Sequence, residues 1–241
     1  MVSGGRDLSR RKEWIEAVMS DYVKKIERLF EMNTDPVQAA QMKKYMRDQF
    51  EYLGIKTPLS KALQNEFYAK YGLPEIAELD FIVRELWKLP HREYKYVAMR
   101  LLDKFEKKLA PQFIKTIEHL IVTDSWWDTV DLIASHQVGG MFKRYPDIKT
   151  KYLAKWRRSK NMWLRRTTLL FQLGYKTDTD FALLCKLIQE NLGSDEFFIN
   201  KAIGWSLRQY AHINPSPVRK FVKTTRELHP LSRREAMKHL E

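Results

Sequence analysis

The chain has 241 residues, of which 44% are hydrophobic and 30% charged, a balance that excludes an intrinsically disordered protein and predicts a globular one. Only 9 Gly and 9 Pro are present, which is few for an all-β protein with many tight turns. The formal net charge of +13 predicts a nucleic acid or another anionic surface as the partner.

Signals for membranes, secretion and disulfides are missing. No apolar run approaches the length of a membrane span, and the N-terminal sequence lacks the hydrophobic segment of a signal peptide. The single cysteine, Cys185, excludes an internal disulfide, and it lies in the apolar run 181–185, where a thiol usually acts as a small hydrophobic group. We therefore expect a cytoplasmic location and no contact with a membrane.

Helical spacing dominates the chain, and no segment shows sustained alternation of apolar and polar residues. Residues 1–11 are predicted to be a flexible lead-in, and residues 12–241 a single domain. The apolar stripe of a first helix consists of Trp14, Val18, Tyr22, Ile26 and Leu29. Further helix starts are indicated where a proline follows a possible cap, at Asp35-Pro36, Thr57-Pro58, Ala110-Pro111, Tyr145-Pro146 and Asn214-Pro215.

The predicted helical pairs recur at a nearly constant spacing. They are expected to start at Pro74, Pro111, Pro146, Asp178 and Pro215, which are 37, 35, 32 and 37 residues apart. This spacing predicts an all-α fold, an α-solenoid of HEAT-like pairs that forms one curved domain with a concave basic face. An irregular helical bundle is the alternative, but it would not produce a period.

The second helix of each pair is expected to line the concave surface. These helices are predicted to begin near Trp126, Asn161 and Glu196, again 35 residues apart. The adjacent glycines Gly139 and Gly140 are predicted to mark a helix end or break, because glycine is costly inside a helix.

The segment 124–131 places two tryptophans and several carboxylates within eight residues. On a helix, Trp127 and Asp131 are four residues apart and would project side by side. The following region, 141–170, carries ten Lys or Arg and a single acid, Asp147. Two interpretations are open: chemistry on a polyanion, or core tryptophans beside solvated acids, and these residues alone favour the second.

The helix predicted after Glu196 has two different faces. One is mostly apolar, and a neighbouring face carries Phe198, Lys201, Trp205 and Arg208. Two cations that flank a tryptophan are not typical of a core, so this face is predicted to bind DNA.

Motifs of many enzyme classes are absent. The sequence has no HExxH, CxxC, glycine-rich phosphate loop or G-x-S-x-G, and its six histidines lack ligand spacing. We therefore expect neither a metal ion nor a cofactor.

Several segments resemble the AlkD family of DNA alkylation repair glycosylases, from about Asp35 to the C-terminus. The resembling segments are 45–46, 53–58, 83–87, 120–131, 161–166 with 170–173, 196–210, and 230–236. The resemblance implies a HEAT-like fold that removes N3- or N7-alkylated purines, such as 3-methyladenine and 7-methylguanine, from double-stranded DNA. It also implies association with the nucleoid through DNA, and we expect a monomer.

The resemblance also implies roles for individual residues. It assigns catalysis to Asp131, Trp127 and Trp205, and DNA contact to Arg166 and Tyr45. The residue pattern itself adds Arg165, Phe198, Lys201 and Arg208 as candidates for DNA binding. Two other classes stay open: a non-catalytic solenoid that binds DNA or RNA, and a protein-binding HEAT scaffold.

One carboxylate suits this reaction. An N3- or N7-alkylated purine is already cationic, so it leaves as a neutral base and needs no general acid, while positive charge develops on the sugar. A single Asp can stabilise that charge and orient water. Asp131 is preferred to Asp128, which points about 60° away on a helix and is expected to be solvated or to cap it.

Overall fold

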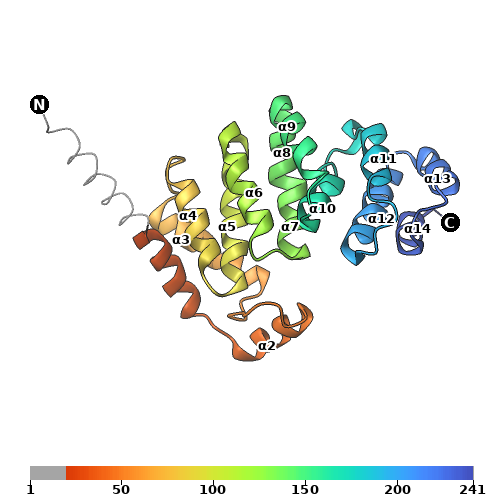
Figure 1. Cartoon of the computed structure of the whole chain (residues 1–241). Coiled ribbons are helices and arrows are strands. Elements are labelled where there is room, and N and C mark those ends of the chain that lie inside the picture. Colours follow the sequence, from red (N-terminus) through yellow and green to blue (C-terminus); the bar gives the residue numbers. More distant parts are fainter. Residues whose placement is uncertain (1–19, 241) are drawn as a thin grey trace, which may run out of the picture. The chain divides into compact units, whose positions relative to one another are not determined.

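The computed structural model describes residues 20–240. Within this range the protein is helical and contains no strand, only an isolated bridge between Glu51 and His91 (Figure 1). The predicted all-α fold is confirmed. The flexible lead-in expected at 1–11, and the first two residues of the first apolar stripe, Trp14 and Val18, lie outside the described residues.

The chain forms two compact units that meet in sequence between Lys108 and Leu109. The first unit contains a helix over residues 20–31, followed by α2 (Pro36–Tyr45), α3 (Thr57–Tyr71), α4 (Leu79–Lys88), α5 (Arg92–Phe105) and the short 3-10 helix η1 (Glu106–Lys108). Its core lies mainly between α4 and α5, whose facing leucine, valine and isoleucine side chains are almost completely buried. Burial of these side chains stabilises the pair.

The start of α4 differs from the prediction. A helix was expected at Pro74, but α4 begins at Leu79. The preceding helix, α3, ends at Gly72 with a φ of 76°, and this left-handed residue turns the chain away. The segment that holds Pro74 is therefore a connection and not a helix start.

A buried carboxylate organises the loop that follows α2. Glu93 of α5 is completely buried and accepts hydrogen bonds from the backbone N–H groups of Leu53, Gly54 and Ile55 at 2.9–3.1 Å. Gly54 has a φ of 89°, and a Cβ atom there would lie 2.0 Å from the carbonyl oxygen of Asp35. This close approach requires glycine and attaches the start of α2 to the unit.

The second unit is a stack of helical pairs. It contains the 3-10 helix η2 (Pro111–Phe113), α6 (Ile114–Val122), α7 (Trp127–Ile133), the π-helix η3 (Ala134–Val138), α8 (Gly139–Arg144), α9 (Pro146–Trp156), α10 (Met162–Leu170), the 3-10 helix η4 (Lys176–Asp178), α11 (Phe181–Gln189), α12 (Phe197–Ala211), α13 (Pro215–Thr224) and α14 (Pro230–Met237). Helices α7, α10, α12 and α14 contact one another in succession, and α9, α11 and α13 pack on this row. Such a two-layer arrangement is that of an α-solenoid.

The predicted starts of the second helices are confirmed. Helices α7, α10 and α12 begin at Trp127, Met162 and Phe197, directly after the predicted positions. The side chain of Asn161 accepts hydrogen bonds from the backbone N–H groups of Trp163 and Leu164, at 2.8 and 3.3 Å, so it caps α10.

Gly139 and Gly140 do not end a helix, contrary to the prediction. Helical backbone continues from α7 through the π turn η3 into α8. Gly139 is buried, and a Cβ atom on it would lie 2.6 Å from the carbonyl oxygen of Phe171. The hydroxyl of Tyr175 also donates to the carbonyl of Gly139 at 2.8 Å. Glycine is needed here because the two segments pack closely, a long-range requirement that its neighbours in sequence do not reveal.

Among the helices of residues 20–240, none has both the length and the apolar character that crossing a membrane would require.

Candidate active site

Helix α7 positions the first two candidate residues. Trp127 is its first residue and is half-buried, and Asp131 follows one turn later. Asp131 is only 8% exposed. The sequence folds locally in this way because Trp126 is extended and its carbonyl accepts the first hydrogen bonds of the helix, from Thr129 and Val130. The carboxylate thus projects from a short helix between its neighbours in the stack.

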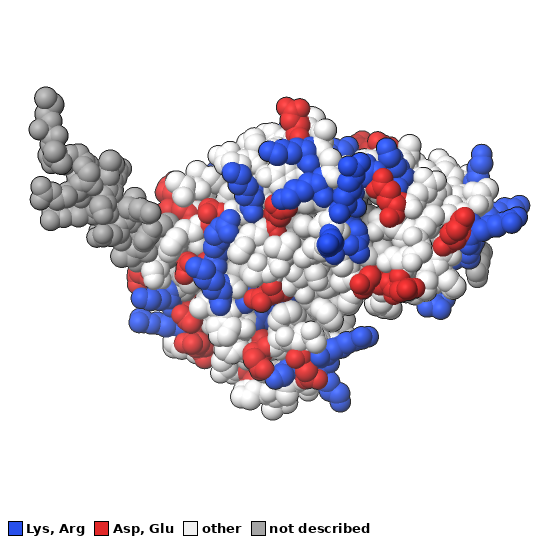
Figure 2. Space-filling model, in the orientation of Figure 1, with Lys and Arg blue, Asp and Glu red and all other residues white. Residues whose placement is uncertain are grey.

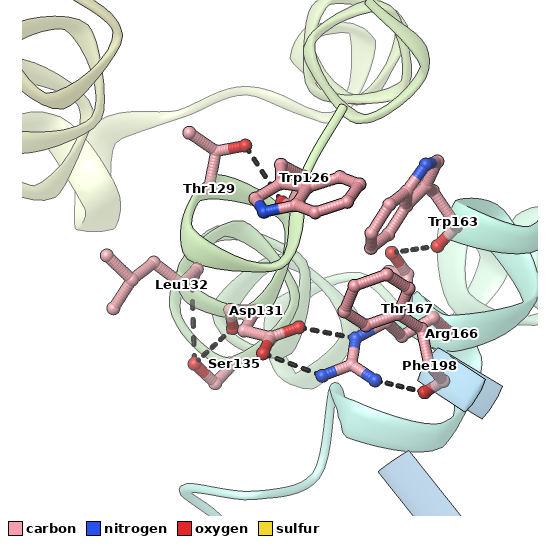
Figure 3. Close-up of polar contacts among 9 residues, drawn as sticks. All are labelled: Trp126, Thr129, Asp131, Leu132, Ser135, Trp163, Arg166, Thr167 and Phe198. Atoms are coloured by element: carbon pink, nitrogen blue, oxygen red, sulfur yellow. Dashed lines mark hydrogen bonds and ion pairs between the residues drawn. The ribbon is translucent and has the colours of Figure 1, made fainter. Parts of the chain in front are cut away.

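The carboxylate of Asp131 forms a two-point ion pair with Arg166 of α10. Nε of Arg166 donates to Oδ1 at 2.7 Å, and Nη2 donates to Oδ2 at 2.8 Å (Figure 3). The remaining terminal nitrogen, Nη1, donates to the backbone carbonyl of Phe198 on α12. The Arg166 side chain is 3% exposed. One guanidinium therefore ties together α7, α10 and α12, and fixes the plane of the carboxylate.

Burial and pairing act in opposite directions on Asp131. Burial raises the pKa of its carboxyl above the ordinary value of 3.8, and the hydrogen bonds from Arg166 pull the pKa back down. The nearby negative charge of Asp128 adds a smaller upward contribution. Since both oxygens accept N–H groups from a permanent cation, the group is a carboxylate at neutral pH.

An aromatic cluster lies beside the ion pair. Trp126, Trp163 and Phe198 come from the starts of α7, α10 and α12, and their ring centroids are 5.0–5.9 Å apart (Figure 3). The guanidinium of Arg166 lies 5.7 Å from the centre of the Phe198 ring. The Trp126 indole nitrogen is buried and has no hydrogen-bond partner within residues 20–240. The cluster excludes water from one side of the pair, which strengthens the local electrostatics.

The sequence predicted part of this cluster. Phe198 was among its candidates for DNA binding, whereas Trp126 was missed. The three rings stand at positions 126, 163 and 198, close to the period of the helical pairs. An aromatic residue that recurs at the start of each second helix was the signal available.

Lys201 and Arg208 meet on an acid that the sequence did not single out. Nζ of Lys201 lies 2.7 Å from Oε1 of Glu235 on α14, and Nη1 of Arg208 lies 2.6 Å from Oε2. The hydrogen bond from Lys201, supported by Arg208, holds the pKa of the Glu235 carboxyl at about 2, although burial opposes this shift. The two cations therefore fasten α12 to α14. Whether they also contact DNA stays a prediction.

The contact between α12 and α14 is close. A Cβ atom on Gly204 would lie 2.4 Å from Cβ of Glu235 and 2.8 Å from the carbonyl oxygen of Ser232. The hydroxyl of Ser232 donates to the carbonyl of Asn200 at 2.8 Å. Trp205 follows Gly204 on α12 and is half-buried. It lies about two helical turns, roughly 10 Å, after Phe198 on a similar side of the helix.

The other two candidates, Arg165 and Tyr45, belong to different units of the chain. Arg165 donates to the carbonyls of Ser159 and Lys160, at 2.8 and 3.2 Å, and so holds the loop before α10. Tyr45 is the last residue of α2 in the first unit and is 74% exposed.

Besides Arg166, three cations of the basic region 141–170 are paired with acids of the second unit. Lys143 lies 3.0 Å from Asp178, Lys155 lies 2.7 Å from Glu118, and Arg157 pairs with Glu190. Figure 2 shows the Lys and Arg side chains gathered over the part of this unit that α8, α9 and α10 form. Lys160 is exposed in the loop that Arg165 holds.

Comparisons with known proteins agree on one kind of relative. A sequence model of the family described as "DNA alkylation repair enzyme" matches residues 26–240. A solved structure described as "Predicted DNA alkylation repair enzyme from Enterococcus faecalis" is 32% identical in sequence, with a TM-score of 0.79 over 86% of this chain and 96% of that chain. No curated protein matches with significance.

Proposed function

Because this chain belongs to the family of DNA alkylation repair enzymes, we propose that it is a DNA glycosylase for cationic alkylpurines in double-stranded DNA. Family membership gives the coarser statement, a role in the repair of alkylated DNA. The observation that carries the finer one is the buried carboxylate of Asp131, held at two points by Arg166 beside an aromatic cluster.

The reaction we propose breaks the bond between C1′ of deoxyribose and N9 of a purine alkylated at N3 or N7. The electron pair of that bond stays with the base and neutralises its positive charge, so no acid has to protonate the leaving group. Positive charge develops on the sugar, as in glycoside hydrolysis. Water then adds its oxygen to C1′ and releases a proton, which gives an abasic site and a neutral base.

Asp131 is suited to stabilise the developing charge. Each of its oxygens accepts one N–H group from Arg166, which leaves further lone pairs on both oxygens for water or for the sugar cation. The Asp131 side chain is 11% exposed, so it is not fully enclosed by the protein. Arg166 prevents the carboxylate from rotating, and a fixed charge costs little reorganisation during the reaction.

Trp127 and Trp205 are proposed to contact the lesion nucleotide. Both are half-buried, which leaves part of each indole accessible. An aromatic face over a cationic base contributes about 0.5–2 kcal/mol. The indoles would also pack on the deoxyribose and exclude water beside Asp131.

Asp131→Asn tests the proposal. The change keeps the size of the side chain but removes its negative charge, so we expect the excision of 7-methylguanine to fall about ten- to a thousandfold. Affinity for undamaged duplex DNA should stay nearly unchanged, which also shows that the variant is folded.

Asp128→Asn is the matched control, because Asp128 lies one turn earlier on the same helix and is half-buried. It should excise at close to the wild-type rate. Full activity of Asp131→Asn would transfer the role to another group. A wild-type chain that binds DNA without excising any alkylated base would instead be a non-catalytic DNA-binding protein.

A further inference from the structure

Helix α2 is a surface element that contributes nothing to the core. None of its residues is buried. It is attached at its two ends: Asp35 caps it, with its backbone N–H donating to the carbonyl of Leu53 at 2.8 Å, and Met46 after its last residue is 3% exposed. A helix whose side chains do not build the core is available for contact with a partner.

The turn that ends α2 is a Schellman motif with arginine at the position that glycine usually occupies. The N–H of Asp48 donates to the carbonyl of Lys43 at 2.9 Å, and the N–H of Arg47 donates to the carbonyl of Lys44 at 3.0 Å. These two bonds form a Schellman motif. The residue after the C-cap in this motif adopts a left-handed conformation and is usually glycine. Here it is Arg47, with a φ of 57°.

Arg47 therefore carries a long side chain at a position where the backbone favours glycine. Asp48 follows with a φ of 59°, but aspartate tolerates this conformation better than arginine does. Strained backbone of this kind is concentrated at functional sites. Arg47 is exposed and its guanidinium has no partner among the described residues.

The surroundings of Arg47 are those of a phosphate-binding surface. Lys44, three residues earlier on the last turn of α2, is also exposed and has no side-chain partner in the part of the chain that the structure describes. Tyr45 lies between them in sequence and is 74% exposed. Lys43, in contrast, pairs with Glu51 and is already neutralised. Two available cations beside an exposed ring complement the charge of a nucleic acid backbone.

We propose that Arg47 and Lys44 form a phosphate-binding site for duplex DNA at the C-terminal end of α2. The proposal rests on the proposed function, because it names a surface through which that enzyme holds its substrate. It assigns to Arg47 a backbone contact that is independent of sequence and of the lesion, and to Lys44 a second contact of the same kind.

Arg47→Gly separates the two roles of the residue. Glycine suits the left-handed conformation, so the melting temperature of the full chain should be equal to or above that of the wild type. The loss of one phosphate contact should weaken the binding of an undamaged duplex by about three- to tenfold near physiological salt. It should also make the plot of log K against log salt shallower by about one unit.

Two variants serve as controls. Arg47→Lys keeps the charge and should keep the wild-type salt slope. Asp48→Gly makes the same backbone change at the neighbouring left-handed residue but leaves the cation in place, so its slope should also be unchanged. Wild-type affinity and slope in Arg47→Gly, or an equal change in Asp48→Gly, would overturn the proposal. Because the duplex is undamaged, this result is distinct from a failure of the glycosylase proposal, which excision alone decides.

Discussion

The buried ion pair between Asp131 and Arg166 makes a quantitative prediction about Arg166→Met. Methionine has a similar length, so the change removes the charge and the hydrogen bonds without opening a large cavity. The variant leaves the buried carboxylate of Asp131 without its cation. Removal of one partner from a buried pair costs about 3–5 kcal/mol. For a chain of this size, that cost should lower the melting temperature by roughly 6–20 °C.

The dependence of this loss on pH tests its cause. Burial raises the pKa of Asp131, and Arg166 is the group that lowers it, so the pKa in Arg166→Met should be higher than in the wild type. As the pH falls through that raised pKa, the carboxyl takes up a proton and its burial becomes less costly. The unfolded chains titrate alike, so the gap in melting temperature between variant and wild type should narrow at acidic pH.

The assay is thermal unfolding of the wild type, Arg166→Met, Asp131→Asn and the double variant, each at neutral and acidic pH. The double variant removes both charges and should lose less than the sum of the two single changes. The resemblance implies that Arg166 contacts DNA, but all three of its nitrogens donate to Asp131 or to the carbonyl of Phe198. We therefore expect a positioning role instead, and the salt slope for binding of undamaged duplex should be nearly unchanged in Arg166→Met. An unchanged melting temperature together with a slope shallower by about one unit would refute this reasoning and make Arg166 a direct phosphate contact.

Two further predictions concern the attachment of α14 to α12 and the two candidate tryptophans, Trp127 of α7 and Trp205 of α12. Glu235→Gln should destabilise the chain near neutral pH, because Lys201 and Arg208 depress the pKa of Glu235 to about 2. The difference in melting temperature between variant and wild type should fade as the pH falls from about 4.3, the ordinary pKa of Glu, towards 2. A difference that stays constant over this pH range would contradict the pairing. Trp127→Ala and Trp205→Ala should each slow the excision of cationic lesions, because each change removes an aromatic face. If either indole only fills the core, its loss would instead lower the free energy of unfolding by about 3–5 kcal/mol and leave excision by the folded variant nearly unchanged.

Local signals predicted much of the helical order. The starts of α7, α10 and α12 follow the 35-residue spacing, and Asn161 caps α10 as its side chain suggests. Pro74 misled the prediction because Gly72, with its left-handed φ, turns the chain before α4 begins. Signals of this kind act within a few residues, so they predict helix boundaries unless a neighbouring residue overrides them.

Contacts between residues on different helices could not be predicted from the sequence in this way. Lys201 and Arg208 can pair with Glu235 because Gly204, which has no Cβ atom, lets α12 and α14 approach closely. Glycine is likewise needed at position 139 because the carbonyl of Phe171 lies close to it, a reason that its own helix does not reveal. Resemblance to a family identified Asp131, but only the packing of three helices shows that Arg166 holds it.

The most direct test of the central claim is the choice of lesion. A site with one carboxylate and no general acid for the leaving base should release only bases that already carry positive charge. We expect the wild-type chain to release 7-methylguanine and 3-methyladenine from duplex DNA, and to leave uracil and hypoxanthine in the same sequence context intact. Release of uracil at a rate comparable to that of 7-methylguanine would contradict the mechanism, because a neutral base requires assistance to leave that Asp131 alone does not supply.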